Sequence, residues 1–306
     1  MTARVTTNLD ELLLLRAEAR GFSLSTRQPV TSLLSGRHAS RLRGRGLDFE
    51  ELRQYHAGDD VRNIDWKATA RLKRPQVRVY TEERERPVLM LVDQRQPMFF
   101  GSRRVMKSVA AAEVASLGAW RTLDAGDRVG ALVFNEREVA HVRPKRSQNA
   151  VLRLLHEVVR MNQELAGDNP AEGSVTLNQV LEMAVQTAHH DYLVVLISDL
   201  DGADEQTRRL TTQLAAHNDL LVVAVYDPLG ASLTGASNMT ATDGQQVWQI
   251  PAGEEFPVRF REAFQRRLDH WRGVFRDLKI PLLPISSATP PAAQVRSLLG
   301  YQHPTT

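Results

Sequence analysis

The sequence has 306 residues, of which 42% are hydrophobic and 25% are charged, and its formal net charge is only +3. These values are ordinary for a globular protein with one large domain or two smaller ones, and the near balance of charges excludes a polycation. The chain contains no cysteine, which excludes disulfides, thiolate metal sites and cysteine nucleophiles and suits a reducing compartment.

The amino-terminal stretch MTARVTTNLDELLLLRAEARGF carries a four-leucine run between charged residues. A signal peptide needs a longer apolar stretch after a basic lead, followed by a small-residue cleavage site. No segment approaches the roughly 20 apolar residues that a membrane helix requires. We therefore expect a cytoplasmic protein that does not enter a membrane.

Residues 1–86 are rich in arginine and poor in long apolar runs. The alternation in QVRVYTEE predicts a half-exposed strand, and a short helix is expected near residues 49–55. The remainder is typical of loops. We expect an irregular N-terminal segment with short strands that packs on the core of the rest.

Strands and helices alternate from residue 87 onward, which predicts a second domain over 87–306. Continuous apolar runs predict buried strands; they lie at 87–93, 127–135, 192–198, 220–227 and 280–286. Two further segments, 137–144 and 244–250, are typical of hairpin arms, the first of them antiparallel at a sheet edge.

Helical spacing of apolar residues follows most of these strands. The predicted helices cover 102–123 with Ser102 as N-cap, 147–162, 177–190, 204–217, about 260–278, and a short one within 289–300. Alternating strands and helices indicate an α/β fold, a doubly wound and mostly parallel sheet with helices on both faces. Ligands of such sheets bind at the carboxyl ends of the strands, where the strand order reverses.

Two acidic residues and one hydroxyl follow elements that end at this edge. Asp93 and Asp199 come directly after predicted buried strands, and Thr176 precedes a predicted helix. Two carboxylates and a hydroxyl are oxygen ligands suited to Mg²⁺. The three side chains are expected to converge, with the two aspartates closest together.

The loop after the first strand reads Asp93-Gln-Arg95-Gln-Pro97 and lacks the further oxygen ligands that a metal would need. Proline offers no side-chain donor or acceptor, and arginine carries a permanent charge. We expect the Arg95 guanidinium to replace the cation, so that no metal or other cofactor is bound.

Plainer structural roles stay open for the same residues. Thr176 and Gln179 have the spacing of a capping box. Asp199 could cap the helix that follows it, and Asp93 could close its own turn.

The stretch GDDVRNIDWKATAR at 58–71 is a second group of charged residues. Asp59, Asp60 and Asp65 could bind a divalent ion or act as a nuclease cluster. The alternating signs favour pairing with basic neighbours in the stretch, with its tryptophan anchored to the core. The basic neighbours are Arg62, Lys67 and Arg71, and the tryptophan is Trp66.

Standard catalytic signatures are absent from the sequence. It contains no phosphate-binding G-x-x-x-x-G-K-[ST] loop, no G-x-S-x-G elbow and no H-E-x-x-H zinc motif. The segment Arg37–Arg45, with Arg37, Arg41, Arg43 and Arg45, could attract nucleic acid. The segment lacks interleaved aromatic residues and is followed at once by acidic ones. Its basic residues are therefore only a weak indication of nucleic-acid binding.

The stretch from residue 47 to residue 93 resembles the signature of the bacterial family catalogued as domain of unknown function 58. Its pattern is F-x-x-[LV]-R-x-Y, then G-D-[DE]-x-R-x-I-D-W-x-x-[ST]-A-R, then a strand that ends in aspartate. The matching residues are Phe49, Arg53, Tyr55, Gly58, Asp59, Asp60, Arg62, Ile64, Asp65, Trp66, Ala70 and Arg71.

This resemblance implies a von Willebrand factor type A-like domain after the signature. In that fold a metal-ion-dependent adhesion site uses D-x-S-x-S after the first strand, a later threonine and a later aspartate. The resemblance assigns these positions to Asp93, Thr176 and Asp199. Arg95 and Pro97 stand where the motif has its two serines. The site is therefore expected to be degenerate.

The resemblance also implies a partner, because members of the family accompany MoxR-type AAA+ ATPases and are thought to act with them in protein maturation or complex assembly. Our main hypothesis is a non-enzymatic module that binds such an ATPase or its protein client. The alternatives are a metal-dependent hydrolase or nuclease using Asp59, Asp60 and Asp65, and nucleic-acid binding through Arg37–Arg45.

Overall fold

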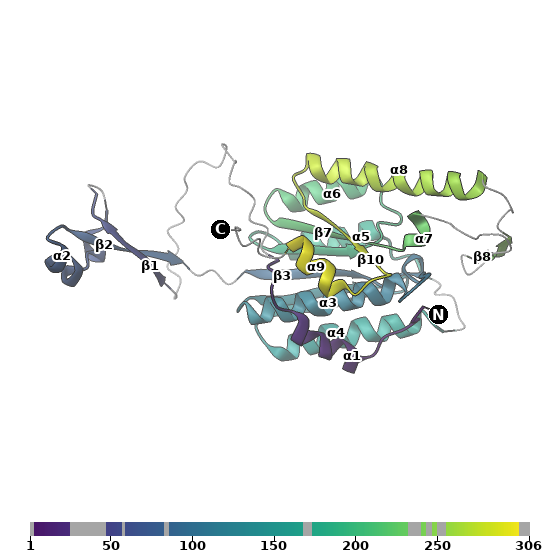
Figure 1. Cartoon of the computed structure of the whole chain (residues 1–306), viewed down its shortest axis with the longest axis horizontal. Coiled ribbons are helices and arrows are strands. Elements are labelled where there is room, and N and C mark those ends of the chain that lie inside the picture. The colour runs from purple at the N-terminus through teal and green to yellow at the C-terminus, as the bar shows by residue number, and fades with distance from the viewer. Residues whose placement is uncertain are drawn as a thin grey trace. The chain divides into compact units, whose positions relative to one another are not determined.

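The computed structural model describes residues 3–24, 47–56, 59–82, 86–167, 173–231, 240–242, 247–249 and 255–299 (Figure 1). The chain divides into two units. The larger comprises Met1–Arg27 and Arg86–Thr306, and the smaller comprises Gln28–Glu85. The predicted first segment spans residues 1–86, whereas the smaller unit ends at Glu85 and the first residues of the chain belong to the larger unit. The predicted packing of the smaller unit on the core stays a prediction.

A six-stranded sheet forms the centre of the larger unit. Its strands are β3 (Pro87–Asp93), β4 (Arg128–Phe134), β5 (Val139–Lys145), β6 (Leu193–Ser198), β7 (Asp219–Tyr226) and β10 (Leu282–Ser286). They lie in the order β10-β7-β6-β3-β4-β5. Every neighbouring pair is parallel except β4 and β5. The mostly parallel α/β sheet and its antiparallel edge hairpin are therefore confirmed.

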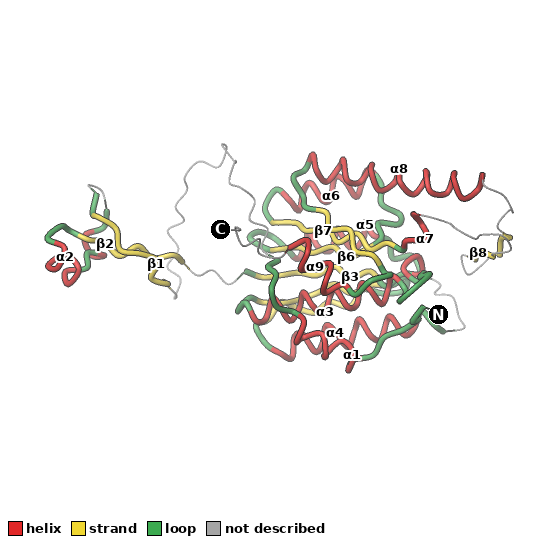
Figure 2. The backbone as a smooth tube through the Cα atoms, viewed as in Figure 1, coloured by secondary structure: helices red, strands yellow, loops and turns green. Residues whose placement is uncertain are grey.

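Helices cover both faces of this sheet (Figure 2). Those of the larger unit are α1 (Leu9–Leu14), α3 (Lys107–Asp124), α4 (Gln148–Glu164), α5 (Leu177–Thr187), α6 (Glu205–Ala215), α7 (Pro228–Ala231), α8 (Glu255–Asp277) and α9 (Pro291–Leu299). Two short 3-10 helices are η1 (Leu15–Glu18) and η3 (Gln96–Met98). One core joins α1, α3, α4 and α9 to the sheet, and a second joins α5, α6 and α8 to the opposite face.

Strand β3 shows why an unbroken apolar run becomes the centre of such a sheet. Its side chains point alternately to opposite faces. Val88, Met90 and Val92 enter the first core, whereas Leu89 and Leu91 enter the second. All seven residues of the strand are buried, so neither face tolerates a polar position until the aspartate at its end.

The start of α3 differs from the prediction. The helix begins at Lys107 after Met106, and Ser102 is not its N-cap. Ser102 instead donates hydrogen bonds from its backbone nitrogen (2.9 Å) and its hydroxyl (2.5 Å) to the buried carboxylate of Asp227. The Ser287 hydroxyl donates to the same carboxylate at 2.6 Å. These bonds tie Ser102 to the residue that follows β7, and α3 starts five residues after Ser102.

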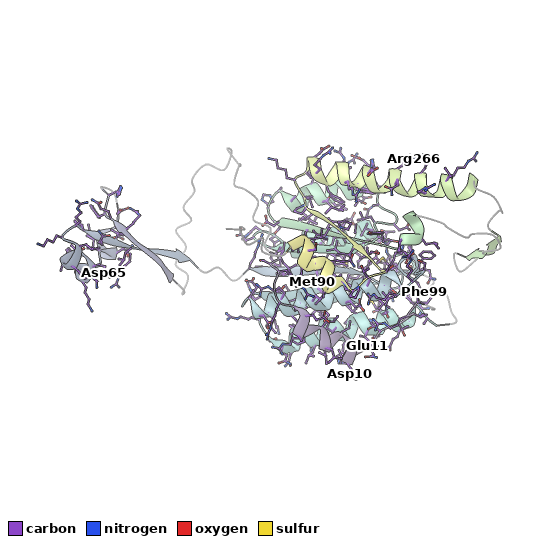
Figure 3. The ribbon with its side chains drawn as sticks, viewed as in Figure 1. Asp10, Glu11, Asp65, Met90, Phe99 and Arg266 are labelled. Carbon is purple, nitrogen blue, oxygen red and sulfur yellow. The ribbon has the colours of Figure 1, made fainter. Side chains whose placement is uncertain are left out.

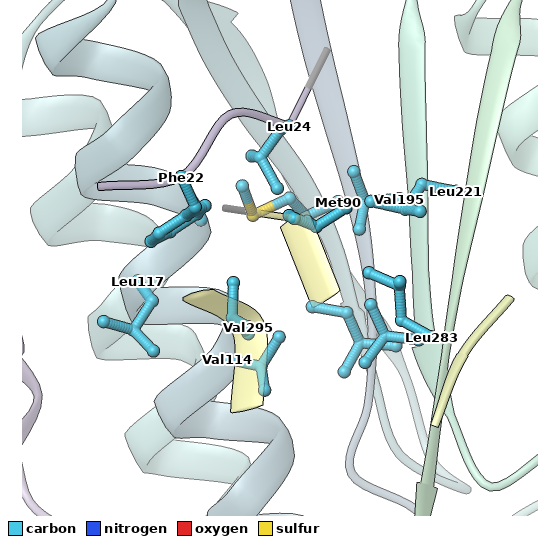
Figure 4. A pocket seen from close by; sticks show the side chains of 13 residues that line it. Phe22, Leu24, Met90, Val114, Leu117, Val195, Leu221, Leu283 and Val295 are labelled. Atoms are coloured by element: carbon cyan, nitrogen blue, oxygen red, sulfur yellow. The ribbon is translucent and has the colours of Figure 1, made fainter. Parts of the chain in front are cut away.

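A small cavity of about 20 Å³ lies between the sheet and α3 (Figure 4). Its lining is apolar and includes Phe22, Met90, Val114, Gly118 and Leu283. A void of this size with so few polar atoms has no partners for a water molecule. It marks a place where the first core is underpacked.

The smaller unit contains an antiparallel pair, β1 (Leu47–Gln54) and β2 (Gln76–Glu82), with α2 (Trp66–Leu72) and the 3-10 helix η2 (Val61–Asn63). The predicted half-exposed strand is confirmed as β2. The predicted helix at 49–55 is wrong, because this stretch forms β1. In the larger unit, β8 (Thr240–Thr242) pairs antiparallel with β9 (Val247–Gln249). The predicted hairpin arm at 244–250 is therefore confirmed over the residues of β9.

Candidate functional site

The candidate site lies where the strand order of the sheet reverses. Strands β3, β4 and β5 extend to one side, and β6, β7 and β10 extend to the other. Asp93 is the last residue of β3, and Ser198 is the last residue of the adjacent β6. Parallel neighbours end at the same edge, so the loops that follow both strands meet there.

The carboxylate of Asp93 is fully buried and has four donors. Its Oδ1 accepts hydrogen bonds from the Arg95 backbone nitrogen and Nε, each at 3.0 Å. Its Oδ2 accepts from Arg95 Nη2 at 2.7 Å and from the Ser198 hydroxyl at 2.6 Å. Two parallel bonds from a guanidinium are the strongest geometry for such a pair.

Arg95 is itself buried, with 7% of its surface exposed. Its Nη2 also donates to the Asp201 carbonyl at 3.0 Å, and its guanidinium lies 5.5 Å from the ring centroid of Phe134. Burial alone would lower its pKa, but the nearby Asp93, Asp199 and Asp201 raise the pKa above its ordinary value. Arg95 is therefore a fixed positive charge at the strand ends. It is too enclosed to reach a carboxylate on a partner.

The loop after β6 curves around this guanidinium. Leu200 has φ 61° and Gly202 has φ 73°. A leucine in the left-handed region is strained, and such strain persists only where the surroundings enforce it. The side chain of Leu200 is buried, and its backbone nitrogen donates to the Ser198 hydroxyl at 3.0 Å.

Asp199 pairs with a residue that the sequence did not single out. Lys107 Nζ lies 2.5 Å from Asp199 Oδ2. The other oxygen of Asp199 accepts from the Asp201 backbone nitrogen at 2.9 Å. Helix α6 is capped by Asp204, so the suggestion that Asp199 caps it is wrong. A second cation thus neutralises the second aspartate.

Thr176 and Pro97 have local roles. Thr176 is exposed, and its hydroxyl accepts from the Gln179 backbone nitrogen at 3.3 Å while the Gln179 side chain accepts from the Thr176 nitrogen at 2.9 Å. The capping box predicted for α5 is therefore confirmed. Pro97 lies at the start of η3, where its fixed φ suits the turn.

Glu136 follows β4 and extends the site. Its Oε1 accepts a hydrogen bond from the Gln96 backbone nitrogen. Its Oε2 is buried and has no hydrogen-bond partner among the described residues. Burial raises the pKa of Glu136, and the charge of Asp93 raises the pKa further. Glu136 could not be identified from the sequence, because it lies beyond the apolar run of its strand.

The outer surface beside the two cations is partly apolar. Phe100 is 43% exposed, and Lys107 Nζ lies 6.0 Å from its ring centroid. The Lys107 backbone nitrogen also donates to the Phe100 carbonyl at 2.8 Å. Phe99, in the same loop, lies at the border of the larger unit (Figure 3). We call Phe99, Phe100 and Lys107 the strand-end rim.

The acidic residues of the signature segment are paired, but with other partners than expected. Arg53 donates to both oxygens of Asp59 at 2.8 and 2.9 Å. Arg78 Nε donates to Asp65 at 2.8 Å. The predicted pairing of Asp59 and Asp65 with Arg62, Lys67 or Arg71 is therefore wrong, because the partners come from β1 and β2 in space.

These contacts lower the pKa values of two carboxylates that were candidates for binding a metal ion. The hydrogen bonds from Arg53 and the His56 backbone lower the pKa of Asp59. Those from the Ala68 backbone and Arg78 lower the pKa of Asp65. Asp60 accepts from the Arg62 backbone nitrogen at 2.9 Å and caps η2.

Trp66 is 70% exposed within the described residues, and the predicted anchoring of this residue to the core of the larger unit stays a prediction. It occupies the first position of α2, directly after the capping residue Asp65. Gly58 and the basic residues Arg37, Arg41, Arg43 and Arg45 lie outside the described residues.

Across the described ranges, no group of three or more histidine and acidic side chains is placed to hold a metal ion. In the same ranges, no helix combines the length and the apolar character needed to cross a membrane.

Comparison with known proteins gives a family. The profile of the family described as "Protein of unknown function DUF58" matches residues 51–272. "Uncharacterized protein Rv1480" of Mycobacterium tuberculosis is 27% identical over 231 residues, which cover 76% of this chain and 71% of that protein. "Uncharacterized protein Mb1516" of Mycobacterium bovis matches with the same identity and coverage.

Proposed function

The chain belongs to the DUF58 family, and we propose that it is a non-enzymatic protein-binding module of the von Willebrand factor type A-like type. In this proposal the strand-end rim binds a MoxR-type AAA+ ATPase or a protein client of that ATPase. The observation that carries the proposal is the Arg95 guanidinium bound to Asp93, at the place where an adhesion site of this fold would hold its cation.

The arrangement of the strand ends supports the fold assignment. Asp93 and Asp199 follow adjacent strands at the point where the sheet order reverses, and both lie close enough to Arg95 to raise its pKa. The two serines of the adhesion motif are replaced by Arg95 and Pro97. A guanidinium and an ammonium then balance the carboxylates, and the site keeps its shape without an ion.

The rim supplies the surface for a partner. An exposed aromatic ring beside a lysine is the kind of group that anchors protein interfaces, since aromatic side chains bury much area at low entropic cost. Phe100 has this exposure and lies beside Lys107. The loop that carries Phe100 is fixed by the bonds from Ser102 to Asp227, so the ring is presented by a rigid support.

The hydrolase alternative draws less support. Asp59 and Asp65 are each neutralised by an arginine, and Asp60 caps η2. A metal-dependent nuclease needs carboxylates that are free to coordinate the ion. The nucleic-acid alternative through Arg37–Arg45 stays a prediction, because that segment lies outside the described residues.

The test uses the purified MoxR-type ATPase of the same organism, immobilised for biolayer interferometry. We expect Phe100→Ser to weaken binding by about 2 kcal/mol, roughly thirtyfold in Kd, as for an aromatic anchor. Leu14→Ser is the matched control, because Leu14 is 75% exposed on α1 and is not part of the rim. Equal binding of both variants and the wild type, or no binding by any of them, would reject this partner and this surface.

A further inference from the structure

A large concavity lies at the sheet edge formed by β5, away from the residues of the strand-end rim. Its volume is about 760 Å³, and its walls come from β5 and α4. The lining residues include His141, Arg143, Lys145, Arg153 and His156. None of them is acidic, and the proposed function does not use any of them.

The basic side chains on the strand wall come from one stretch of β5. His141, Arg143 and Lys145 are exposed on this strand. His141 and Arg143 are two residues apart, which is about 6.5–7 Å along a strand. A bulge opposite Gly130 lies between Val142 and Lys145 and interrupts the regular alternation of side chains there. The strand therefore presents basic groups along its edge, but not at a regular repeat.

The helix wall adds basic groups from a separate element. Arg153 and His156 are exposed on α4, three positions apart and therefore on neighbouring turns of one helix face. Basic groups thus line the concavity from two sides.

These cations are not neutralised within the described part of the chain. Arg143, Lys145 and Arg153 make no ion pair with any residue that the structure describes. Farther along α4, by contrast, Arg160 pairs with Glu138, Glu157 and Glu164. Acidic residues are therefore available on this helix, and they neutralise a different arginine.

Edge protection explains only part of this pattern. Among the strands that the structure describes, β5 pairs with β4 alone, and edge strands commonly carry lysine, proline and a bulge that prevent association with other sheets. Lys145, Pro144 and the bulge opposite Gly130 fit that role. Arg153 and His156 lie on a helix, where no strand edge needs protection. Because Arg153 and His156 line the same concavity as the basic residues of β5, the concavity is suited to an anionic ligand.

We propose that this concavity binds an extended, carboxylate-rich peptide segment of a partner protein. The acidic side chains of such a segment are complementary in charge to the basic groups that β5 and α4 bring to the concavity. The features that prevent pairing with apolar strands then make the edge selective for an acidic one. Single-stranded nucleic acid fits less well, because the described residues that line the concavity include no phenylalanine, tyrosine or tryptophan to stack on its bases.

The experiment is a fluorescence-anisotropy titration of the full chain with a labelled ten-residue peptide of alternating glutamate and threonine. We expect saturable binding that weakens with added salt. Arg143→Glu combined with Arg153→Glu should weaken it at least tenfold. Arg208→Glu combined with Arg209→Glu is the control, because it makes the same change in net charge on α6 and should leave the Kd within about twofold.

Three results would overturn the proposal. They are absence of binding by the wild type, equal loss of binding in both charge-reversed variants, and tighter binding of a ten-residue oligothymidylate than of the peptide. The last would assign the surface to nucleic acid. If the double reversal lowers the melting temperature, Arg143→Gln with Arg153→Gln replaces it, with a loss of at least threefold expected. Because the rim residues are unchanged in all these variants, failure here leaves the proposed ATPase contact standing.

Discussion

Asp93 and Arg95 are buried charges that depend on each other. Removing one partner of a buried pair leaves an uncompensated charge and costs about 3–5 kcal/mol. We expect Arg95→Ala to lower the free energy of unfolding by about that amount, measured by urea denaturation. The double variant Asp93→Ala with Arg95→Ala should lose clearly less than the sum of the single variants.

The exposed pair of Arg208 with Glu205 is the control for this measurement. Arg208→Ala should lower the free energy of unfolding much less than Arg95→Ala does, since exposed ion pairs contribute little. If the losses at Asp93 and Arg95 were additive, the two side chains would not be coupled as the distances indicate.

Glu136 gives the site a pH dependence of known sign. Its folded-state pKa is raised by burial and by Asp93. The folded state therefore favours the protonated form of Glu136. This form contributes to the free energy of unfolding below the ordinary glutamate pKa, and the contribution is lost as the pH rises through the raised folded-state pKa. We therefore expect Glu136→Gln to raise the melting temperature at pH 7.5, and the gain to shrink as the pH is lowered to 4.5, because more of the wild-type carboxyl is then protonated.

Glu205→Gln should show the opposite sign. The hydrogen bond from Arg208 lowers the pKa of Glu205, so its charged form is the stabilising one and Glu205→Gln should be slightly destabilising at pH 7.5. A gain for Glu136→Gln that did not change between the two pH values would show that its charge is not the cause.

Ligands of parallel sheets bind at the carboxyl ends of the strands, and the predicted strands end at two aspartates. This was enough to identify Asp93, Arg95 and Asp199 from the sequence. It did not identify Lys107, since the expected helix start at Ser102 placed this lysine inside the helix. A basic residue at the first position of a helix opposes the helix dipole and is a signal that an acidic partner lies nearby. Here that partner is Asp199.

At the scale of elements, α3 and β3 leave the small cavity of the first core between them. A Cβ added at Gly118 would lie 3.0 Å from Met90 Cε, the flexible end of that side chain. The adjacent cavity offers room for Cε to move. Replacing glycine by alanine within a helix gains about 0.8–1 kcal/mol.

We therefore expect Gly118→Ala to stabilise the protein by about 0.5–1 kcal/mol, measured by thermal and urea unfolding. Gly118→Val is the matched control. Its larger, branched side chain would exceed the space beside Met90 and should be destabilising. A loss of stability in Gly118→Ala would mean that Met90 cannot move.

Buried parallel strands were the most predictable elements, because both of their faces are apolar and the run of letters is continuous. β1 was mistaken for a helix for a physical reason. Its register shifts between Phe49 and Glu51, which interrupts the alternation that identifies a strand. Pairing with β2 decides its conformation, and no local pattern in the sequence reports that pairing.

At the scale of the molecule, the sequence predicted two parts but did not show that the first residues of the chain complete the larger one. Leu12, Ala19 and Phe22 are fully buried in the first core. Thr7 contributes a backbone bond of 2.9 Å to the buried Asn162, whose side chain donates to Gln94 at 2.9 Å. The amino-terminal residues are thus bonded, through two buried amides, to the loop that carries Arg95.

In our proposal Arg95 and Lys107 take the place of a metal ion at the ends of β3 and β6. Calorimetric titration with Mg²⁺ is the decisive measurement. The wild type should give no heat of binding up to millimolar Mg²⁺. The variant Arg95→Ser, Pro97→Ser, Lys107→Ala restores two hydroxyls and removes both cations, and it should bind the ion. Binding by the wild type that is lost in Asp93→Ala, or no binding by the triple variant in its folded state, would contradict the account.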